Sequence, residues 1–391
     1  MDTLPLLRFI PFRVGDIVAM CLAEGRLDSA GQVWFEMARE RMASRIREHF
    51  HQLRQQLKDA YGPLDPDADT RLVTEFRDPT ASAAFSSLLE RVLDSANYEK
   101  LNRQEVKRAL TKASPFKVQL QVETDAFEEF LIYIRGISRR EEEVRKLLGL
   151  WRSRVEFVSY DRVVLYLRCR EDIDAESRSR GSPPGGTMLK LFRDVPAADL
   201  EMLFPGTRIR MRTVDKLLIG VPALVSGGVV VSTKLGTTLV LLGSLIGFWL
   251  GFSSERVELD RSAVLALLAG AGALAAYLWK QFSKFRNRKL KYNRALTENL
   301  YFKLLDNNAG VLYRVLGEAE DAELKESLLA CYFLLAHGEP MKADELDRTI
   351  ETWFAKRWEC RVDFEVGDAL EKLEALGLAS RSGGRWQLVA S

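Results

Sequence analysis

The chain of 391 residues has few of the residues on which most enzyme active sites are built. It contains only three histidines, and its four cysteines share no short spacing: Cys21, Cys169, Cys331 and Cys360. Neither a disulfide framework nor a CxxC zinc site is therefore expected. The motifs typical of serine hydrolases, zinc proteases, phosphate-binding loops and dinucleotide-binding folds are absent as well. We predict a protein that is not an enzyme, with no catalytic, cofactor-binding or metal-ligating residues.

The chain also lacks a charge of one dominant sign. Lys and Arg (57) nearly balance Asp and Glu (55), which gives a net charge of +2. A nucleic-acid-binding protein commonly carries a strong positive field, so this balance argues against nucleic acid as a partner. At this length the chain can form two or three domains with a sizeable core.

One long apolar block stands out from a mean hydropathy of −0.12. Residues 217–233, 235–254 and 262–279 contain no charged side chain, and only Lys234 and a short charged loop interrupt them. About 20 apolar residues of helix cross a bilayer. Buried helices of a soluble core, the alternative interpretation, rarely lack a polar face over such a length. The predicted fold class is therefore an α+β membrane protein with a two-helix transmembrane hairpin.

The position of Lys234 decides how the block is divided. Three spans would leave too few residues around Lys234 to form a turn, although three spans stay open as an alternative. We expect a short interfacial segment at 217–228, followed by spans at about 229–252 and 262–279. Four basic residues precede the block, seven follow it, and the connecting loop has a net charge of −1. Because basic residues stay on the cytoplasmic side, both termini should be cytoplasmic in a multi-pass protein.

A ridge of small residues runs along the first predicted span. Gly243, Gly247 and Gly251 recur every fourth residue, a spacing that lets another helix approach closely. The ridge could pack against the second span or, alternatively, against a second copy of the chain. We predict a helix-packing role for these glycines in either case.

The remaining sequence divides by its hydrophobic periodicity. Helical spacing dominates the N-terminal part, and alternation indicates strands from residue 115 onward, with a charged helix expected at Arg139–Leu150. The predicted parts are a helical N-terminal region (1–114), a small α+β domain (115–212), the membrane region (217–280), a basic juxtamembrane helix (281–319) and a C-terminal domain (320–391).

The C-terminal domain resembles a winged-helix fold. Helices are expected at Leu324–Ala336, at Ala343–Trp358 and around Leu370, followed by a hairpin that turns at Gly383-Gly384. The region of the third helix carries five acidic residues against one lysine, whereas a DNA-reading helix needs basic residues to meet phosphate. The domain is therefore predicted to dock a protein or to have a purely structural role.

A basic cluster follows the second predicted span. We predict contact with anionic lipid headgroups, although the charges could serve only to fix the topology. The residues concerned are Lys284, Arg286, Arg288, Lys289 and Lys291.

The histidines and two of the cysteines are predicted to be structural. His49 and His51 are two positions apart on a helix, so they cannot bind one metal ion together. His337 precedes Gly338 at a helix end, where it would interact with the last carbonyl groups. Cys21 and Cys331 lie in apolar helical stretches and are expected in the core.

Four segments together resemble the transmembrane protein 143 family. They are RFIPFR (Arg8–Arg13), YEKLNRQEVKRAL…SPFKV (Tyr98–Val118), DVPAADLEMLFPGTRIRM (Asp194–Met211) and KYNRALTENLYFKLLDNNAGVLYR (Lys291–Arg314). The family comprises uncharacterised membrane proteins of bacteria, plants and animal mitochondria. The resemblance implies a central transmembrane region and no established activity, cofactor or catalytic residue. Because the chain begins almost at the first motif, without a presequence, we expect a bacterial inner-membrane protein.

These observations favour a non-enzymatic membrane anchor or scaffold. Its cytoplasmic domains would dock a protein partner or a second copy of the chain. The alternative is a lipid-interacting or transport-accessory protein, for which membrane lipids are the partner and which could act on lipid at the interface.

Overall fold

The computed structural model describes most of the chain outside the central apolar block. The described residues are 6–69, 81–102, 119–121, 126–146, 151–172, 185–205, 208–210 and 300–389, with single positions between 261 and 290. They fall into two compact units that group the chain differently from the predicted domains. The first unit combines Met1–Lys112, Val122–Thr207 and Lys303–Ser391, and the second combines Ala113–Gln121 with Arg208–Phe302.

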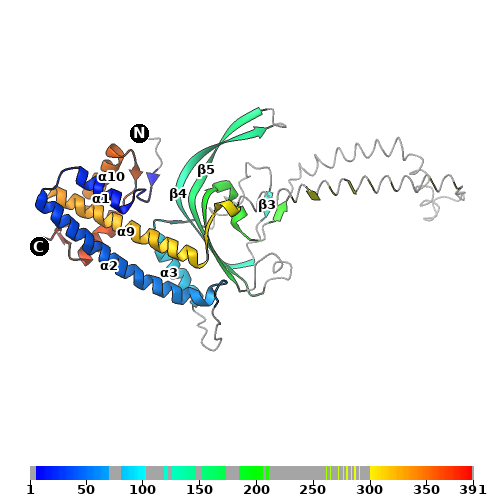
Figure 1. Ribbon diagram of the computed structural model, residues 1–391, viewed down its shortest axis with the longest axis horizontal. Coiled ribbons are helices and arrows are strands. Elements are labelled where there is room, and N and C mark those ends of the chain that lie inside the picture. The colour runs from blue at the N-terminus through cyan, green and yellow to red at the C-terminus, as the bar shows by residue number, and fades with distance from the viewer. Residues whose placement is uncertain are drawn as a thin grey trace. The chain divides into compact units, whose positions relative to one another are not determined.

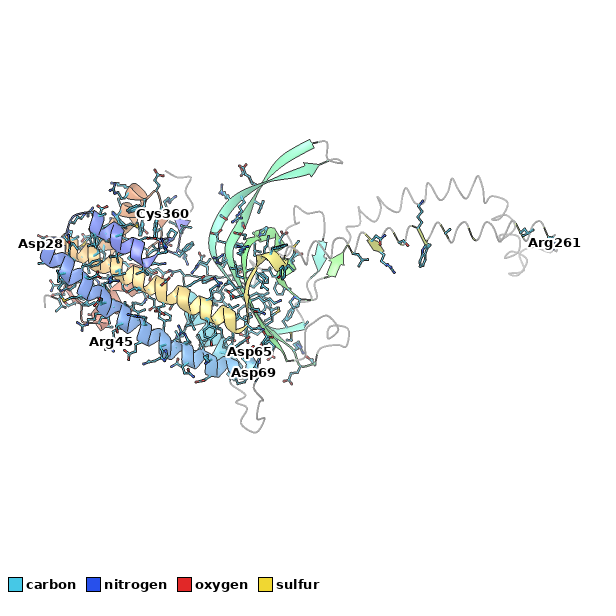
Figure 2. All side chains as sticks on the ribbon, in the orientation of Figure 1. Asp28, Arg45, Asp65, Asp69, Arg261 and Cys360 are labelled. Atoms are coloured by element: carbon cyan, nitrogen blue, oxygen red, sulfur yellow. The ribbon has the colours of Figure 1, made fainter. Side chains whose placement is uncertain are left out.

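Long amphipathic helices form the first layer of the first unit. Helix α2 (Ser29–Tyr61) begins at Asp28, whose side chain accepts a hydrogen bond from the backbone N–H of Gly31 at 2.7 Å. Figure 2 labels Asp28 at this end of the helix. Apolar side chains recur every three or four residues along α2 and are buried: Phe35, Met42, Ile46, Phe50, Leu53 and Leu57. Helix α9 (Ala309–His337) packs alongside α2, as Figure 1 shows, and α1 (Val14–Ala23) and α3 (Ala81–Ser95) also contact α9.

An antiparallel sheet of five strands forms the second layer. Its order is β2-β4-β5-β6-β8, with every neighbouring pair antiparallel. The strands are β2 (Glu99–Lys100), β4 (Phe127–Lys146), β5 (Trp151–Cys169), β6 (Thr187–Pro196) and β8 (Leu304–Asn307). Figure 1 shows β4 and β5 as the two long strands of the sheet.

Both faces of the sheet are covered in its central part. Tyr133 of β4, Tyr166 of β5 and Leu191 of β6 face the helices and belong to the main core. Successive side chains on a strand point to opposite faces, so Leu165 and its paired residue Lys190 face the other way. There the helical turn η4 (Ala197–Leu203) packs on β5 and β6.

The two ends of the chain meet within the first unit. Strand β1 (Leu6–Leu7) pairs in parallel with β9 (Arg361–Val362). Phe12 stacks on Phe354 with ring centroids 5.9 Å apart, and it meets Trp358 edge-on at 6.2 Å. The N-terminal segment is therefore part of the core of the C-terminal region rather than of a separate domain.

The C-terminal elements follow the sequence prediction closely. Helices α10 (Ala343–Arg357) and α11 (Val366–Ala375) are followed by the hairpin of β10 (Ala379–Ser382) and β11 (Arg385–Leu388). Its turn lies at Gly383 and Gly384, which both have positive φ, a conformation that glycine adopts at low cost. Met341, before α10, pairs with Trp386 of the hairpin.

Little of the second unit is described. Its strands β3 (Gln119–Gln121) and β7 (Arg208–Arg210) pair antiparallel. The alternation starting at residue 115 thus does contain a strand, although most of the stretch lies outside the described residues.

The structure corrects the predicted fold class and localisation. Among the residues it describes, no helix is both long enough and apolar enough to cross a bilayer. The long helices α2 and α9 carry charged residues along their exposed sides, whereas a spanning helix must be apolar around its circumference. The two-helix transmembrane hairpin, the multi-pass localisation and the inner-membrane assignment are therefore not supported. The predicted spans at 229–252 and 262–279 lie outside the described residues, apart from isolated positions of the second.

Two local predictions are also wrong. The sequence predicts a helix at Arg139–Leu150, but the segment from Arg139 to Lys146 is the outer part of strand β4. It pairs with β5, and the last pair is Lys146 with Trp151. Pairing overrides the helix propensity of its charged residues. The basic juxtamembrane helix expected at 281–319 is interrupted, because Leu304–Asn307 forms the edge strand β8 beside β6 and α9 begins at Ala309.

A basic groove as the candidate functional site

A groove of about 650 Å³ lies beside helix α10. Residues after the end of α1, one side of α10 and Phe333 of α9 line it. Four of its lining side chains are basic and two are acidic: Arg26, Arg348, Lys356 and Arg357 against Glu24 and Glu345. We call it the α10 groove.

The sequence of α10 determines which side chains face the groove. Leu346, Ile350 and Phe354 are buried against the core, so the helix is fixed in one rotation. Arg348 and Lys356, eight residues apart, then lie on the exposed side. The N-terminus of α10 is held by the Glu345 carboxylate, which accepts a hydrogen bond from the Lys342 backbone N–H at 3.1 Å.

Glu24 forms the polar floor of the groove. Its carboxylate accepts a hydrogen bond from Trp353 Nε1 at 2.9 Å. It also lies 3.5 Å from Arg357 Nε and 3.4 Å from Arg26 Nη2. One carboxylate thus joins α1 to α10, and its single charge is shared between two arginines. The ring of Phe333 packs edge-on against Trp353, with centroids 5.4 Å apart.

The other two cations of the groove are left without a carboxylate. Within the part of the chain that the structure describes, neither Arg348 nor Lys356 has an acidic oxygen within 4 Å. Arg348 Nε only donates to the backbone carbonyl of Asp344, at 2.9 Å. Glu345, the other acid of the groove, holds the Lys342 N–H and lies 3.8 Å from Arg385. The α10 groove therefore presents surplus positive charge that an anionic ligand could neutralise.

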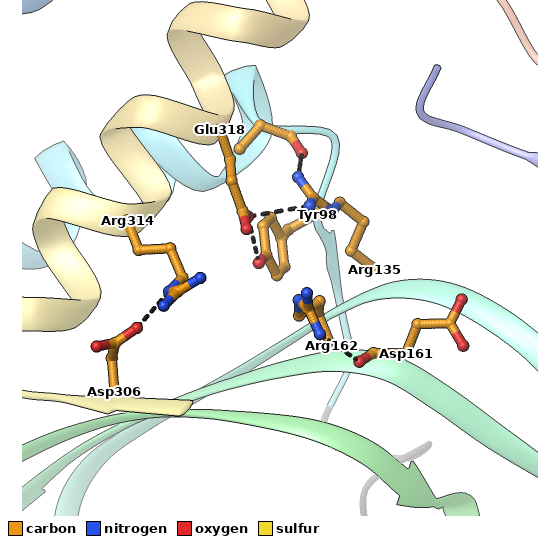
Figure 3. Close-up of polar contacts among 8 residues, drawn as sticks. Tyr98, Arg135, Asp161, Arg162, Asp306, Arg314 and Glu318 are labelled. Carbon is orange, nitrogen blue, oxygen red and sulfur yellow. Dashed lines mark hydrogen bonds and ion pairs between the residues drawn. The ribbon is translucent and has the colours of Figure 1, made fainter. Parts of the chain in front are cut away.

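A second polar cluster, between α9 and the sheet, is built differently. Arg135 of β4 lies 3.1 Å from Glu318 of α9 and donates to the carbonyl of Ala96, also at 3.1 Å (Figure 3). The Tyr98 hydroxyl donates to the same Glu318 carboxylate at 2.7 Å. The Arg135 guanidinium also lies over the ring of Tyr98, at 4.8 Å. We call these residues the α9 network.

The α9 network leaves little capacity for a ligand. Its charged groups are mostly buried and already paired, with Arg135 and Glu318 exposing 14% and 19% of their side chains. Nearby, Arg314 pairs with Asp306, and Arg162 donates to the carbonyl of Asp161 at 3.4 Å (Figure 3). This arrangement fixes α9 on the sheet, so we assign it a structural role.

A further buried acid, Glu326, lies on α9, two turns beyond Glu318. Glu326 accepts a hydrogen bond from Asn97 Nδ2 at 2.9 Å. Burial raises the pKa of Glu326 to about 7, and the hydrogen bond from Asn97 and the charge of Lys372 oppose the increase. Glu326 lines neither the α10 groove nor the smaller cavity described below.

The predicted functional residues mostly lie outside the described part of the chain. This applies to Gly243, Gly247 and Gly251 and to Lys284, Arg288, Lys289 and Lys291. Arg286 is described and exposed. The helix-packing and lipid-contact roles stay predictions.

The predicted structural residues are found where the sequence placed them. His49 and His51 are exposed on α2. His337 is the last residue of α9, as predicted, but the carbonyl oxygen that its Nδ1 contacts, at 3.1 Å, belongs to Glu339, beyond the end of the helix. Cys21 and Cys331 are buried, which raises the pKa of each thiol to about 12. In the described residues, no group of three His, Cys, Asp or Glu side chains is placed to hold a metal ion.

Sequence reasoning missed the residues of the α10 groove. It weighed the charge of the third helix of the C-terminal domain, α11, and did not consider the second, α10. The signal was present, because Arg348, Thr352 and Lys356 recur every four residues on the side of the helix that its apolar residues leave free. The contribution of Glu24 and Arg26, more than 300 positions away, could not be read from that pattern.

Comparison with known protein families gives one match. A family model described as "Protein of unknown function (DUF3754)" matches residues 160–310. The matched segment is shorter than half of the chain, and it contains part of β5 and all of β6, η4, β7 and β8. No solved structure matches the chain. The resemblance to the transmembrane protein 143 family therefore stays a prediction.

Proposed function

We propose that this protein is a non-enzymatic docking module that holds an acidic segment of a partner protein in the α10 groove. The observation that carries the proposal is the pair Arg348 and Lys356, which are exposed on one side of α10 and have no carboxylate partner among the described residues. Both line a groove large enough for several side chains of a partner.

The geometry of α10 defines the spacing that a partner must match. Eight residues of helix rise about 12 Å, so Arg348 and Lys356 present two positive charges roughly that far apart. An extended segment covers about 3.3 Å per residue, which brings acidic side chains about four residues apart into register with both. Trp353 and Phe333 line the groove between these charges, but they expose only 6% and 2% of their surface, so the charges carry the recognition.

The environment of the groove favours a salt-sensitive, rapidly formed complex. Its cations are exposed, so attraction for an acidic partner acts mainly through long-range steering and is screened by salt. We therefore expect affinity in the micromolar range, rising as ionic strength falls. A stable permanent complex would require a larger apolar area than the groove offers.

A peptide-binding measurement tests this proposal. The probe is a fluorescein-labelled 12-residue peptide of alternating Glu and Ala, followed by fluorescence anisotropy with the full chain. The variant R348E/K356E should weaken binding at least tenfold, because it replaces two attractive charges with two repulsive ones. A peptide with Gln in place of Glu should not bind.

The matched control reverses two cations on α2 instead. Arg47 donates from Nε to the backbone carbonyl four residues earlier, at 3.0 Å, as Arg348 does, and Lys58 is also exposed. The variant R47E/K58E changes net charge by the same amount and should bind the peptide nearly as well as the wild type. Equal loss in both variants, or unchanged binding by R348E/K356E, would contradict docking in the α10 groove.

A further inference from the structure

A smaller cavity is lined by residues of β5 and β6, by the turn after α2 and by the two residues that precede α9. It has a volume of about 210 Å³, and its wall is largely apolar: Leu167, Cys169, Met188, Pro66 and Pro205 contribute to it. Of the described residues that line it, Lys190 of β6 is the one basic residue and none is acidic. We call it the β6 cavity.

Three distant segments are fixed together around the β6 cavity. Thr187 donates from its hydroxyl to the Leu64 carbonyl, which ties β6 to the turn after α2. Asn308 accepts from the Leu189 backbone N–H at 3.3 Å and donates to Asp67 at 2.5 Å. These contacts hold the walls of the β6 cavity in place without a ligand.

The backbone at Asn308 is strained to make these contacts. Its φ is 47°, a left-handed conformation that a non-glycine residue seldom adopts, and Asn308 is buried. Strain of this kind persists where the surrounding contacts enforce it and is concentrated at binding and catalytic sites.

Lys190 is a cation without a partner in this setting. Among the described residues, no carboxylate lies within ion-pair distance of its ammonium group. Burial lowers the pKa of Lys190, and no neighbouring charge contributes to the decrease. A desolvated charge without a counter-ion is unfavourable, and an anion in the cavity would relieve it.

Lys325 of α9 provides the contrast. Burial also lowers its pKa, but Asp321, Glu326 and Glu318 act in the opposite direction. Among the described residues, acids surround Lys325, whereas none lies within ion-pair distance of Lys190. The difference makes Lys190 the half-buried lysine that an added anion would neutralise.

We propose that the β6 cavity binds a small aliphatic monocarboxylate, with its carboxylate on Lys190 and its apolar part against Leu167, Met188 and Pro205. The mostly apolar wall favours a ligand with a hydrocarbon body over a fully hydrated inorganic anion. The site shares no residue with the α10 groove, so it is independent of the proposed docking function.

Ligand-observed NMR with the full chain tests the proposal, with butyrate as the probe. Saturation transfer to butyrate should be observed with the wild type and with K325M, and it should be at least tenfold weaker with K190M. Butyramide, which has the same shape and no charge, should not compete. The K190M variant should melt no lower than the wild type, because it removes an uncompensated charge from an apolar site; this separates lost binding from lost folding.

Chemical labelling gives a second, independent readout. An amine with a lowered pKa reacts faster with trinitrobenzenesulfonate at neutral pH, so Lys190 should be among the first lysines labelled. Mass spectrometry of the digested protein identifies the labelled lysines, and butyrate should slow the labelling of Lys190. Equal saturation transfer with K190M, or equal competition by butyramide, would overturn the proposal. Displacement of butyrate by equimolar inorganic phosphate would overturn the assignment to a carboxylate.

Discussion

The α9 network and the α10 groove both contain arginines and glutamates, but these charged residues have different roles in the two regions. In the network, Arg135 is mostly buried and its guanidinium meets a carboxylate, a carbonyl and an aromatic ring. In the groove, Arg348 is exposed and donates to a backbone carbonyl of its own helix. It has no carboxylate within 4 Å among the described residues, although Glu345 and Asp347 are near enough for its charge to favour the ionised form of each. A largely buried charge is costly unless the fold pairs it, because water cannot solvate it fully, whereas an exposed charge needs no partner within the fold. We therefore interpret the paired charges of the α9 network as structural and the cations of the α10 groove without a carboxylate partner as a recognition surface.

The largest expected effect comes from breaking the network. The variant R135M leaves Glu318 without its cation and the Ala96 carbonyl without its donor. Removing one partner of a largely buried ion pair costs about 3–4 kcal/mol in the free energy of unfolding. Urea denaturation followed by circular dichroism measures this loss.

A double variant shows whether the loss comes from the pair itself. In R135M/E318Q no charge is left unpaired, and Tyr98 can still donate its hydroxyl hydrogen to the side-chain amide oxygen that the second substitution introduces. The double variant should therefore be more stable than R135M alone. If it is less stable by the sum of both single losses, the two residues act independently and the network interpretation fails.

Glu326 extends the comparison to a buried acid whose charge is only weakly compensated by its neighbours. Its folded-state pKa of about 7 lies above the ordinary value of 4.5, owing to burial first, with Glu365 and Asp368 adding to the shift. The protonated acid is therefore favoured by folding. Its contribution to stability is complete below about pH 4.5 and is lost as the pH rises to about 7.

The variant E326Q should remove this dependence, since glutamine resembles the protonated acid and can still accept the hydrogen bond from Asn97. We expect E326Q and wild type to be equally stable near pH 4.5. At pH 8 the variant should be more stable by about 2–3 kcal/mol. Thermal melts of both proteins from pH 4.5 to 8 check this, and parallel curves across that range would show that Glu326 does not titrate as described.

Local sequence patterns predicted α10 and α11 well, whereas the helix expected at Leu324–Ala336 begins at Ala309, as part of α9. Helical periodicity and turn residues act over a few positions, so α10, α11 and the turn at Gly383-Gly384 could be placed from sequence. Strand pairing acts over long distances. The outer half of β4 consists of good helix formers, and only its partner β5 makes it a strand. The same applies to Leu304, which joins β6 from more than 100 positions away.

The candidate sites were harder to predict than the elements that carry them. Arg348 and Lys356 could have been found from their spacing, but Glu24 comes to the groove only because the N-terminal segment packs on the C-terminal region. Lys190 could be placed on a strand by alternation. The absence of a described acid within ion-pair distance of it, however, is a property of the assembled sheet, and no local pattern encodes it.

The smallest expected effect concerns the groove and completes the comparison. The variant R348Q/K356Q removes two exposed charges that have no carboxylate partner in the described fold. Surface substitutions of this kind change the free energy of unfolding by less than about 0.5 kcal/mol. Because four cations share the groove with two acids, relieved repulsion should make the change neutral or slightly stabilising, and more so at low salt. Urea denaturation at two ionic strengths measures it. A clear destabilisation would mean that these charges support the fold, and the distinction between paired structural charge and free recognition charge would not hold for α10.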